Sequence, residues 1–169
     1  WRTMLVGTLG ADGKGYFVLD VTKPGYTGGA QTSNFTAANA ANLVVMDKTD
    51  GDDADIGHVF GDPVTSEFNK QSATQIVKMN NGRWAVVFGN GYNSTNEQPV
   101  LLIQYLDGDK SLKKISAATT GTEATQNGLS TPRLVDLNGD GTPDVVYAGD
   151  LRGNLWIGRA QIANIRNIF

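Results

Sequence analysis

The chain has 169 residues, of which 40% are hydrophobic, so it is long enough to bury the core of one compact domain. Only 18% of the residues are charged and 21 are glycine, which favours a sheet protein with many turns over a helical bundle. The net charge of -3 and the lack of a basic run exclude nucleic acid as an expected partner, and the lack of cysteine excludes a disulfide scaffold, a thiolate metal site and a cysteine nucleophile.

The chain opens inside what reads as a strand, Trp1–Val6, with no initiator methionine. The sequence contains no signal peptide and no apolar run of membrane-spanning length. We therefore expect a fragment cut from a longer protein, in which case the missing signal is uninformative.

The first expected elements are two strands, Thr3–Thr8 and Tyr16–Val21, joined by a glycine-rich turn. Residues 23–42 are rich in Gly, Thr, Ala, Asn and Ser and have little hydrophobic pattern. This composition predicts an irregular loop or insertion. A short apolar run, Leu43–Met46, predicts the next strand.

An acidic cluster follows this run. It contains Asp47, Asp50, Asp52, Asp53 and Asp55. Its spacing is not that of a phased metal loop, so we favour a solvated acidic turn over a second ion site. His58 has no second histidine or cysteine to share a zinc ion, and we expect a surface or structural role for it.

The second half of the chain predicts two groups of antiparallel strands. An Asn-Gly pair at 81–82 between alternating segments marks the clearest hairpin. The expected strands are Gln75–Met79, Arg83–Gly89, Pro99–Tyr105, Ser111–Ser116, Pro132–Val135, Val145–Ala148 and Asn154–Gly158. The tail, residues 160–169, is too short to classify.

A weak repeat runs through these strands, in which an apolar strand ends in glycine and a polar turn and another apolar strand follow. Its glycines are Gly7, Gly89 and Gly149. Repeated antiparallel meanders are typical of propeller blades. We therefore predict one all-β domain over residues 1–169, a partial β-propeller of roughly three blades, which is too few to close a ring. The open sheet edges make self-association a hazard.

The most informative stretch is residues 136–144, where oxygen-bearing groups fall at positions 1, 3, 5, 7 and 9 and glycine at position 6 permits a sharp turn. The predicted ligands are Asp136, Asn138, Asp140, Thr142 through its backbone carbonyl, and Asp144. Three carboxylates and neutral oxygens suit Ca²⁺ better than Mg²⁺, which demands a strict octahedron.

This loop differs from an EF-hand because position 12 is Tyr147 in place of Glu and its flanks are apolar and β-branched. The alternative interpretation is a polar hairpin turn, since Asn-Gly and Asp-Gly are common turn dipeptides. Four oxygen-bearing side chains in phase favour the metal interpretation, and we predict a calcium loop that joins two strands.

Residues 127–156 resemble the C-terminal β-propeller of the PilY/PilC family of type IV pilus biogenesis factors and tip adhesins. Residues 5–22 and 81–94 agree with the same family in the same order. The resemblance implies a quinoprotein-like propeller of a secreted bacterial protein, displayed at the pilus tip or the outer membrane surface, that takes part in adhesion and twitching motility. It implies pilins and a host surface receptor as partners.

In that family a calcium loop of this form is associated with control of pilus extension against retraction. The resemblance assigns that role to Asp136, Asn138, Asp140, Thr142 and Asp144. The fragment lacks the region that carries the family's more variable adhesive domain, so pilus biogenesis is the expected role ahead of adhesion.

Two other classes of function remain as alternatives. A quinoprotein dehydrogenase or a glycan hydrolase is disfavoured, because the sequence offers no plausible pair of nucleophile and base once its best carboxylates bind calcium. A calcium-dependent glycan or host-receptor module is the closer alternative. It needs Tyr92, Trp84 or Trp156 to stack on sugar, and we expect these aromatic residues to pack in the core.

Overall fold

The computed structural model describes residues 1–23, 26–27, 30–31, 35–61, 76–118 and 125–159, and its strands form three antiparallel sheets and one short hairpin. The first sheet contains, in spatial order, β1 (Met4–Thr8), β2 (Tyr16–Asp20) and β5 (Val44–Lys48). The second contains β6 (Ile76–Lys78), β7 (Trp84–Gly89), β8 (Val100–Tyr105) and β9 (Leu112–Ser116). The third contains β10 (Arg133–Val135), β11 (Val145–Gly149) and β12 (Leu155–Arg159).

These sheets confirm the all-β prediction, and the predicted strands are present within one or two residues of their expected bounds. The insertion at 23–42 is more regular than predicted. Within it, β3 (Tyr26–Thr27) pairs with β4 (Ala30–Gln31), and a 3-10 turn, η2 (Ala37–Asn39), leads into the short helix α1 (Ala40–Leu43). Alanine has the highest helix propensity, and the alanines in this segment are the local reason that it forms the 3-10 turn and the short helix. Residues 24–25, 28–29, 32–34 and the tail at 160–169 lie outside the described residues.

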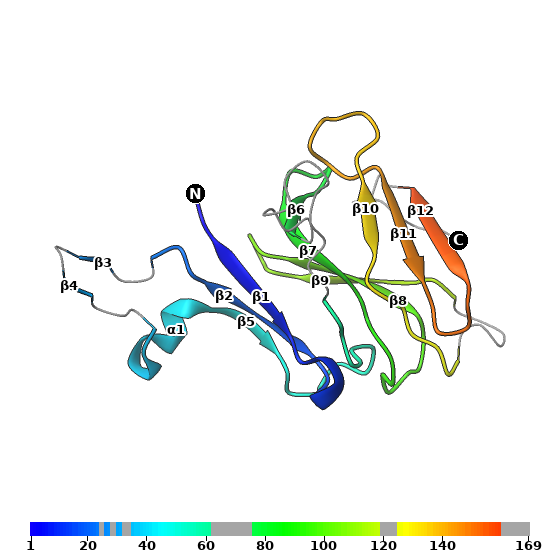
Figure 1. Cartoon of the computed structure of the whole chain (residues 1–169), viewed down its shortest axis with the longest axis horizontal. Coiled ribbons are helices and arrows are strands. Elements are labelled where there is room, and N and C mark those ends of the chain that lie inside the picture. Colours follow the sequence, from blue (N-terminus) through cyan, green and yellow to red (C-terminus); the bar gives the residue numbers. More distant parts are fainter. Residues whose placement is uncertain (24–25, 28–29, 32–34, 62–75, 119–124, 160–169) are drawn as a thin grey trace.

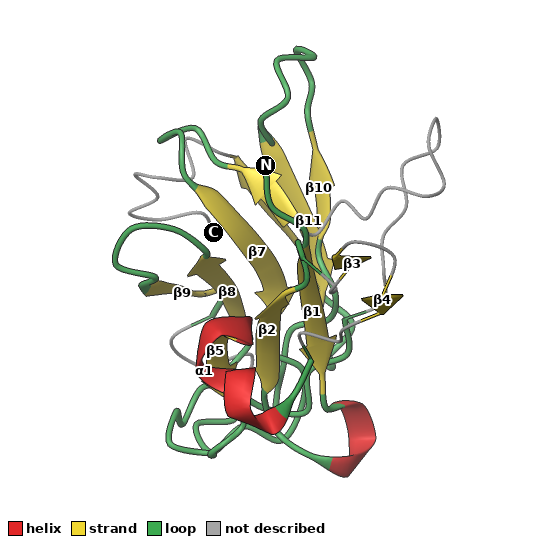
Figure 2. Ribbon diagram, turned by 90° about the vertical axis from the view of Figure 1, so that its left-hand side faces the viewer, coloured by secondary structure: helices red, strands yellow, loops and turns green. Residues whose placement is uncertain are grey.

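The second sheet is buried on both of its faces, between the first sheet and the third (Figures 1 and 2). Successive side chains on a strand point to opposite faces. On β7, Val87 packs toward the third sheet and Phe88 toward the first, and on β8 Ile103 and Leu102 divide in the same way. This is why the sequences of β7 and β8 are nearly continuous apolar runs.

One polar pair lies inside the core between the first two sheets. The Tyr16 hydroxyl donates a hydrogen bond of 2.7 Å to Oε1 of Gln104, and both residues are fully buried. Burial, with the nearby charge of Asp53, raises the pKa of Tyr16, so the phenol stays neutral and remains a donor. Nε2 of Gln104 donates to the carbonyl of Lys110 at 2.8 Å. The buried amide therefore has partners for both its oxygen and its nitrogen.

A second polar side chain, Asn90, ties three chain segments together at the end of β7. Its Oδ1 accepts hydrogen bonds from the backbone N–H groups of Val100 and Leu129, each at 3.0 Å. Its Nδ2 donates to the carbonyls of Asp55 and Gln98, each at 2.8 Å. Asn90 is fully buried, and these four bonds use its full capacity to donate and accept.

Asp150 occupies the matching place at the end of β11. Its Oδ2 accepts hydrogen bonds from Trp156 Nε1 at 2.7 Å, Asn127 Nδ2 at 2.9 Å and Asn154 Nδ2 at 3.0 Å. Burial alone would raise the pKa of Asp150, but the hydrogen bonds from Asn154, Asn127 and Trp156 outweigh it and lower that pKa to about 2. The carboxylate therefore organises the turn into β12.

The repeat glycines explain how closely these segments approach. Gly89 and Gly149 end β7 and β11 as predicted, whereas Gly7 lies inside β1. A Cβ atom on Gly89 would collide with the carbonyl oxygen of Ser130. Glycine is therefore required at the end of β7, because the segment that leads into the third sheet lies too close for a side chain.

We expect Leu102→Ala to lower the free energy of unfolding by about 2–5 kcal/mol, because Leu102 is fully buried between two sheets and its truncation leaves a cavity. The matched control is Leu155→Ala, since Leu155 is 67% exposed on β12 and its loss changes stability by less than about 0.5 kcal/mol. Urea unfolding measures both variants. Similar losses in the two variants would contradict the two-sided packing of the second sheet.

We expect Asp150→Asn to lower the free energy of unfolding by about 1–3 kcal/mol, because one acceptor oxygen becomes a donor that faces other donors. The pKa of Asp150 in the folded chain is about 2, below its ordinary value of 3.8. The stability that the carboxylate contributes is therefore present above pH 3.8 and is lost as the pH falls through about 2. Urea unfolding across this range should show a smaller acid loss in the variant, and an identical acid loss would refute the assignment.

Candidate metal centre

The predicted calcium loop, residues 136–144, joins β10 to β11 and projects beyond the ends of the sheets (Figures 1 and 2). The backbone N–H of Asp144 donates to the carbonyl of Val135 at 2.8 Å and closes the base of the loop. No residue of the loop belongs to either of the two core clusters among the described residues. The loop is therefore held by the two strands and by its own hydrogen bonds.

Asp136 at position 1 organises the first half of the loop. Its Oδ1 accepts a hydrogen bond from the N–H of Gly139 at 2.7 Å, and its Oδ2 accepts one from the N–H of Gly141 at 2.8 Å. Both glycines have positive φ, 78° at Gly139 and 85° at Gly141, a conformation that glycine adopts without strain. The glycine predicted to permit the sharp turn is therefore found in that conformation.

Asp140 at position 5 organises the second half. Its Oδ1 accepts from the hydroxyl of Thr142 at 2.6 Å and from the N–H of Thr142 at 2.8 Å. These bonds lower the pKa of Asp140, so the carboxylate is charged at neutral pH. Asn138 Nδ2 donates to Oδ2 of Asp140 at 3.1 Å, and Oδ2 of Asp144 accepts from the N–H of Leu137 at 2.9 Å.

The five predicted ligands thus lie on one exposed loop, but their side chains turn toward N–H and hydroxyl groups of the loop. In the described part of the chain, no three Asp, Glu or His side chains converge closely enough to hold a metal ion. A carboxylate has about four lone-pair sites, so an oxygen that accepts from one N–H still has capacity to bind a cation. The donor set, three carboxylates with amide and carbonyl oxygens, fits the oxygen preference of Ca²⁺. The ligand assignment stays a prediction.

Two aspartates of the acidic cluster at 47–55 pair with a lysine from the second sheet. Lys114 Nζ lies 2.9 Å from Oδ1 of Asp53 and 2.8 Å from Oδ2 of Asp55, beside a cavity of about 370 Å³. Its hydrogen bonds to Asp55 and Asp53 raise the pKa of Lys114. Burial alone would raise the pKa of Asp55, but the hydrogen bonds from Lys114 and Asn96 hold it below its ordinary value.

The other three aspartates of this cluster are exposed, and these are Asp47, Asp50 and Asp52. Asp47 among them lies on β5 and not in a turn. Sequence reasoning missed Lys114, because it lies 61 residues from Asp53 and no local pattern connects the two. The ammonium group of Lys114 supplies the positive charge between the carboxylates of Asp53 and Asp55.

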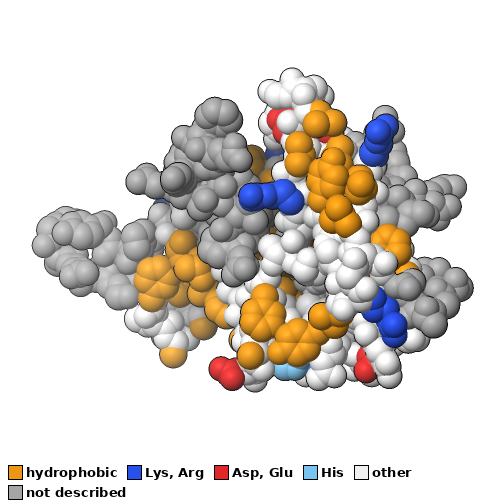
Figure 3. All heavy atoms as spheres, turned by 45° about the vertical axis from the view of Figure 1, so that its right-hand side comes forward, with side chains coloured by type: hydrophobic (Ala, Val, Ile, Leu, Met, Phe, Trp, Pro, Cys, Tyr) orange, Lys and Arg blue, Asp and Glu red, His pale blue; other side chains and the backbone are white. Residues whose placement is uncertain are grey.

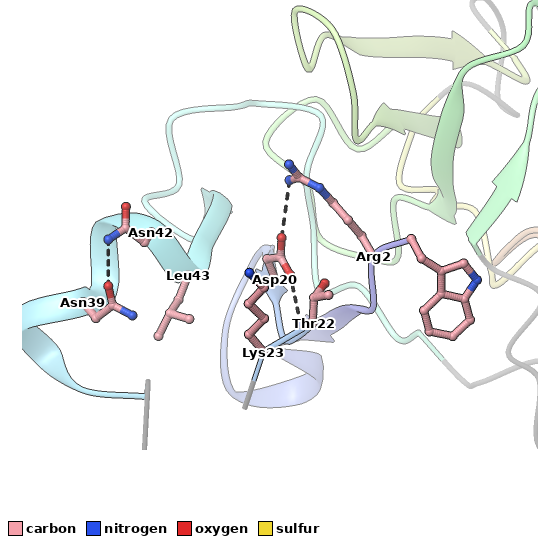
Figure 4. Close-up of a pocket in the computed structure, with 8 residues that line it drawn as sticks. Arg2, Asp20, Thr22, Lys23, Asn39, Asn42 and Leu43 are labelled. Carbon is pink, nitrogen blue, oxygen red and sulfur yellow. Dashed lines mark hydrogen bonds and ion pairs between the residues drawn. The ribbon is translucent and has the colours of Figure 1, made fainter. Parts of the chain in front are cut away.

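A further cavity, of about 390 Å³, lies between the ends of β1 and β2 and the helix α1 (Figure 4). Arg2 Nη1 is 3.4 Å from Oδ2 of Asp20, and Oδ1 of Asp20 accepts a hydrogen bond from the N–H of Thr22 at 3.0 Å. On the opposite wall, Asn42 Nδ2 donates to Oδ1 of Asn39 at 2.7 Å. Arg2, Asp20 and Thr22 on one wall, and Asn39 and Asn42 on the other, therefore bond within their own wall.

Two of the three aromatic residues expected in the core are exposed instead. Trp84 is 50% exposed because it opens β7 opposite the exposed Lys78, and only the rest of that strand is buried. Tyr92 is 36% exposed and follows the end of β7. Trp156 is partly buried against the core between the second and third sheets, as predicted.

Tyr92 belongs to an aromatic stack that the sequence did not reveal. Its ring centroid lies 4.9 Å from that of His58 and 5.8 Å from that of Phe60, with nearly parallel planes. His58 Nδ1 is 3.0 Å from the carbonyl oxygen of Gly10, a contact that agrees with the expected surface or structural role of this histidine. Figure 3 shows hydrophobic side chains gathered on the surface beside the histidine.

The family model described as the PilY1 beta-propeller domain matches residues 1–164. The chain is 40% identical over 157 residues to the type IV pilus biogenesis factor PilY1 of Pseudomonas aeruginosa strain PAO1, and 38% identical over 163 residues to a PilY1 homolog of Xylella fastidiosa strain Temecula1. Each alignment covers 92% of this chain, but only 11% and 10% of those relatives.

A solved structure is also similar. The crystal structure of the Pseudomonas aeruginosa PilY1 C-terminal domain superposes with a TM-score of 0.66 at 37% identity, and the match covers 93% of this chain and 26% of that one. None of the helices in the described part of the chain is long and apolar enough to cross a membrane. The family match spans nearly the whole chain, and the three stacked sheets agree with it. The chain therefore belongs to the PilY1 β-propeller family.

Proposed function

We propose that this chain is a calcium-binding, non-enzymatic propeller domain of a type IV pilus biogenesis protein, and that calcium occupancy of the loop at 136–144 regulates pilus extension against retraction. The observation that carries the proposal is the donor set of this loop, with Asp136, Asn138, Asp140, Thr142 and Asp144 on one projecting turn. The names of the relatives, type IV pilus biogenesis factors, support the pilus role.

The residues of the loop suit a switch between an open state and an ordered state. Three carboxylates on nine residues repel one another, and the repulsion favours an open loop when nothing offsets their charge. Calcium bound there would supply two positive charges, and the oxygen atoms of the loop would be its shared ligands. Asp136 and Asp140 then hold the turn through the N–H groups of Gly139, Gly141 and Thr142. Ordering of the loop fixes the surface beside β10 and β11 that a partner recognises.

The expected partners are pilins, and a host surface receptor is the second candidate. We place the domain outside the cell, at the pilus tip or the outer membrane surface, because a loop of this chemistry fills most readily where calcium is millimolar. Pilus-related partners follow from the relatives' role in pilus biogenesis.

The exposed stack of Tyr92 and Phe60 supports one alternative, a calcium-dependent module that binds glycans or a host receptor. Phe60 is 46% exposed and Tyr92 is 36% exposed, so their rings are accessible for stacking on a sugar. Binding to a glycan array that is lost in Tyr92→Ala would favour this alternative over the pilus switch.

We expect Asp140→Ala to weaken calcium binding by at least about 100-fold, because loss of an indirect supporting group at a metal site already costs about 10–100-fold and Asp140 is a predicted direct ligand. Calorimetric titration of the chain with Ca²⁺ measures this loss, and Mg²⁺ serves as the ion control. The matched variant is Asp52→Ala, which removes an exposed aspartate outside the loop and should leave the titration unchanged.

The same two substitutions in the full-length protein separate the switch from simple binding. Asp140→Ala should alter twitching motility, whereas Asp52→Ala should not. Equal calcium binding in the unsubstituted chain and in Asp140→Ala would remove the loop as the metal site. Thermal unfolding without calcium should be the same for both variants, since neither residue belongs to a core cluster.

A further inference from the structure

We propose that Asn138 is a site of spontaneous deamidation, and that the order of the loop at 136–144 sets the rate of this modification. In the reaction, the backbone nitrogen of Gly139 attacks Cγ of Asn138 and forms a new N–C bond. The bond from Cγ to Nδ2 breaks, and ammonia leaves with the proton of the attacking N–H. Water then opens the resulting succinimide at either carbonyl and yields aspartate or isoaspartate. Glycine favours this ring closure because it has no side chain to hinder the attack.

The chain contains four Asn-Gly pairs in which this reaction is chemically possible. Their asparagines are Asn81, Asn90, Asn127 and Asn138. Asn90 is fully buried and Asn127 is 1% exposed, and both are held by hydrogen bonds at the ends of the sheets. Water reaches the side-chain amides of Asn90 and Asn127 only when the packed ends of the sheets open. Asn81 and Asn138 are the exposed pairs, and they differ in what holds them.

Asn81 is held by the second sheet. Its Nδ2 donates to the hydroxyl of Tyr105 at 2.9 Å, and its Oδ1 accepts from the N–H of Arg83 at 3.1 Å. The attacking group, the N–H of Gly82, donates to the carbonyl of Met79 at 2.8 Å. Tyr105 and Met79 are both buried, so the core holds the groups to which Asn81 and Gly82 bond.

Among the described residues, Asn138 is held only by its own loop. Its Oδ1 accepts from the N–H of Asp140 at 2.9 Å, and its Nδ2 donates to Oδ2 of Asp140 at 3.1 Å. The attacking N–H of Gly139 donates to Oδ1 of Asp136 at 2.7 Å. Asp136, Asn138 and Asp140 are all exposed, so a local opening of the loop frees both reacting groups and leaves the core intact.

The product changes the loop in a definite way, and this step rests on the proposed calcium function. Either product replaces a neutral amide with a carboxylate at position 3. The isoaspartate product also adds one methylene to the main chain between Asp136 and Asp140. This shifts the phase of the later oxygens, so the modified loop no longer presents its ligands to one ion. Calcium, in turn, protects Asn138 by holding the loop closed.

The experiment incubates the intact chain without divalent ions, with Ca²⁺ and with Mg²⁺, and follows Asn138 and Asn81 by peptide mapping with mass spectrometry. Without calcium we expect Asn138 to deamidate several-fold faster than Asn81. Calcium at about 100 times its dissociation constant should slow the reaction at Asn138 by about 100-fold, because the open fraction falls by that factor. The rate at Asn81 should not change. Asn138→Gln and Asn81→Gln confirm which peptide carries each signal.

The outcomes separate this proposal from the calcium proposal. A rate at Asn138 no faster than at Asn81 without calcium overturns the modification site. A fast rate at Asn138 that calcium does not slow supports the modification site and counts against the calcium site. A fast rate that calcium slows and magnesium does not supports both.

Discussion

Burial of both faces of the second sheet is the constraint on which the rest of this structure depends. Val87 and Ile103 fill the space toward the third sheet, and Phe88 and Leu102 fill the space toward the first. The outer sheets have three strands each and obtain their cores by packing on this central one. Because a side chain removed from water contributes about 1.5–3 kcal/mol, the central strands hold the three sheets together as one unit.

Apolar packing alone does not fix how one sheet is oriented relative to the next, and the polar residues at the strand ends fix that orientation. Asn90 joins the end of β7 to the segment before β10, and Asp150 joins the end of β11 to Asn127 and Trp156. Each is positioned directly after a strand-ending glycine, Gly89 or Gly149. The bonds of Asn90 are buried and those of Asp150 are partly buried, and they fix how the chain turns at the ends of these strands, since an unpaired partner in such a site is costly.

The spacing of apolar residues and the turn dipeptides were enough to locate the strands of the three sheets, because β7 and β8 are apolar runs and Asn81-Gly82 is a strong hairpin signal. They did not reveal the short strands β3 and β4. A loop between β10 and β11 was also predictable, and the calcium ligation that the phase of its oxygens indicates stays a prediction. The hydrogen bonds from the N–H groups of Gly139 and Gly141 to Asp136 were not predictable, since the same carboxylate oxygens can bind either a cation or an N–H group. The pairing of Lys114 with Asp53 and Asp55 and the exposure of Trp84 depend on contacts between distant segments, which no local pattern encodes.

The position of the loop at 136–144 limits how far any change within it can travel. It extends from the ends of β10 and β11, and among the described residues it contributes nothing to the packed clusters. A rearrangement confined to the exposed part of the loop breaks no contact within those clusters. A partner that senses the state of this loop therefore contacts the loop directly, and the sheets of the propeller hold the loop in place.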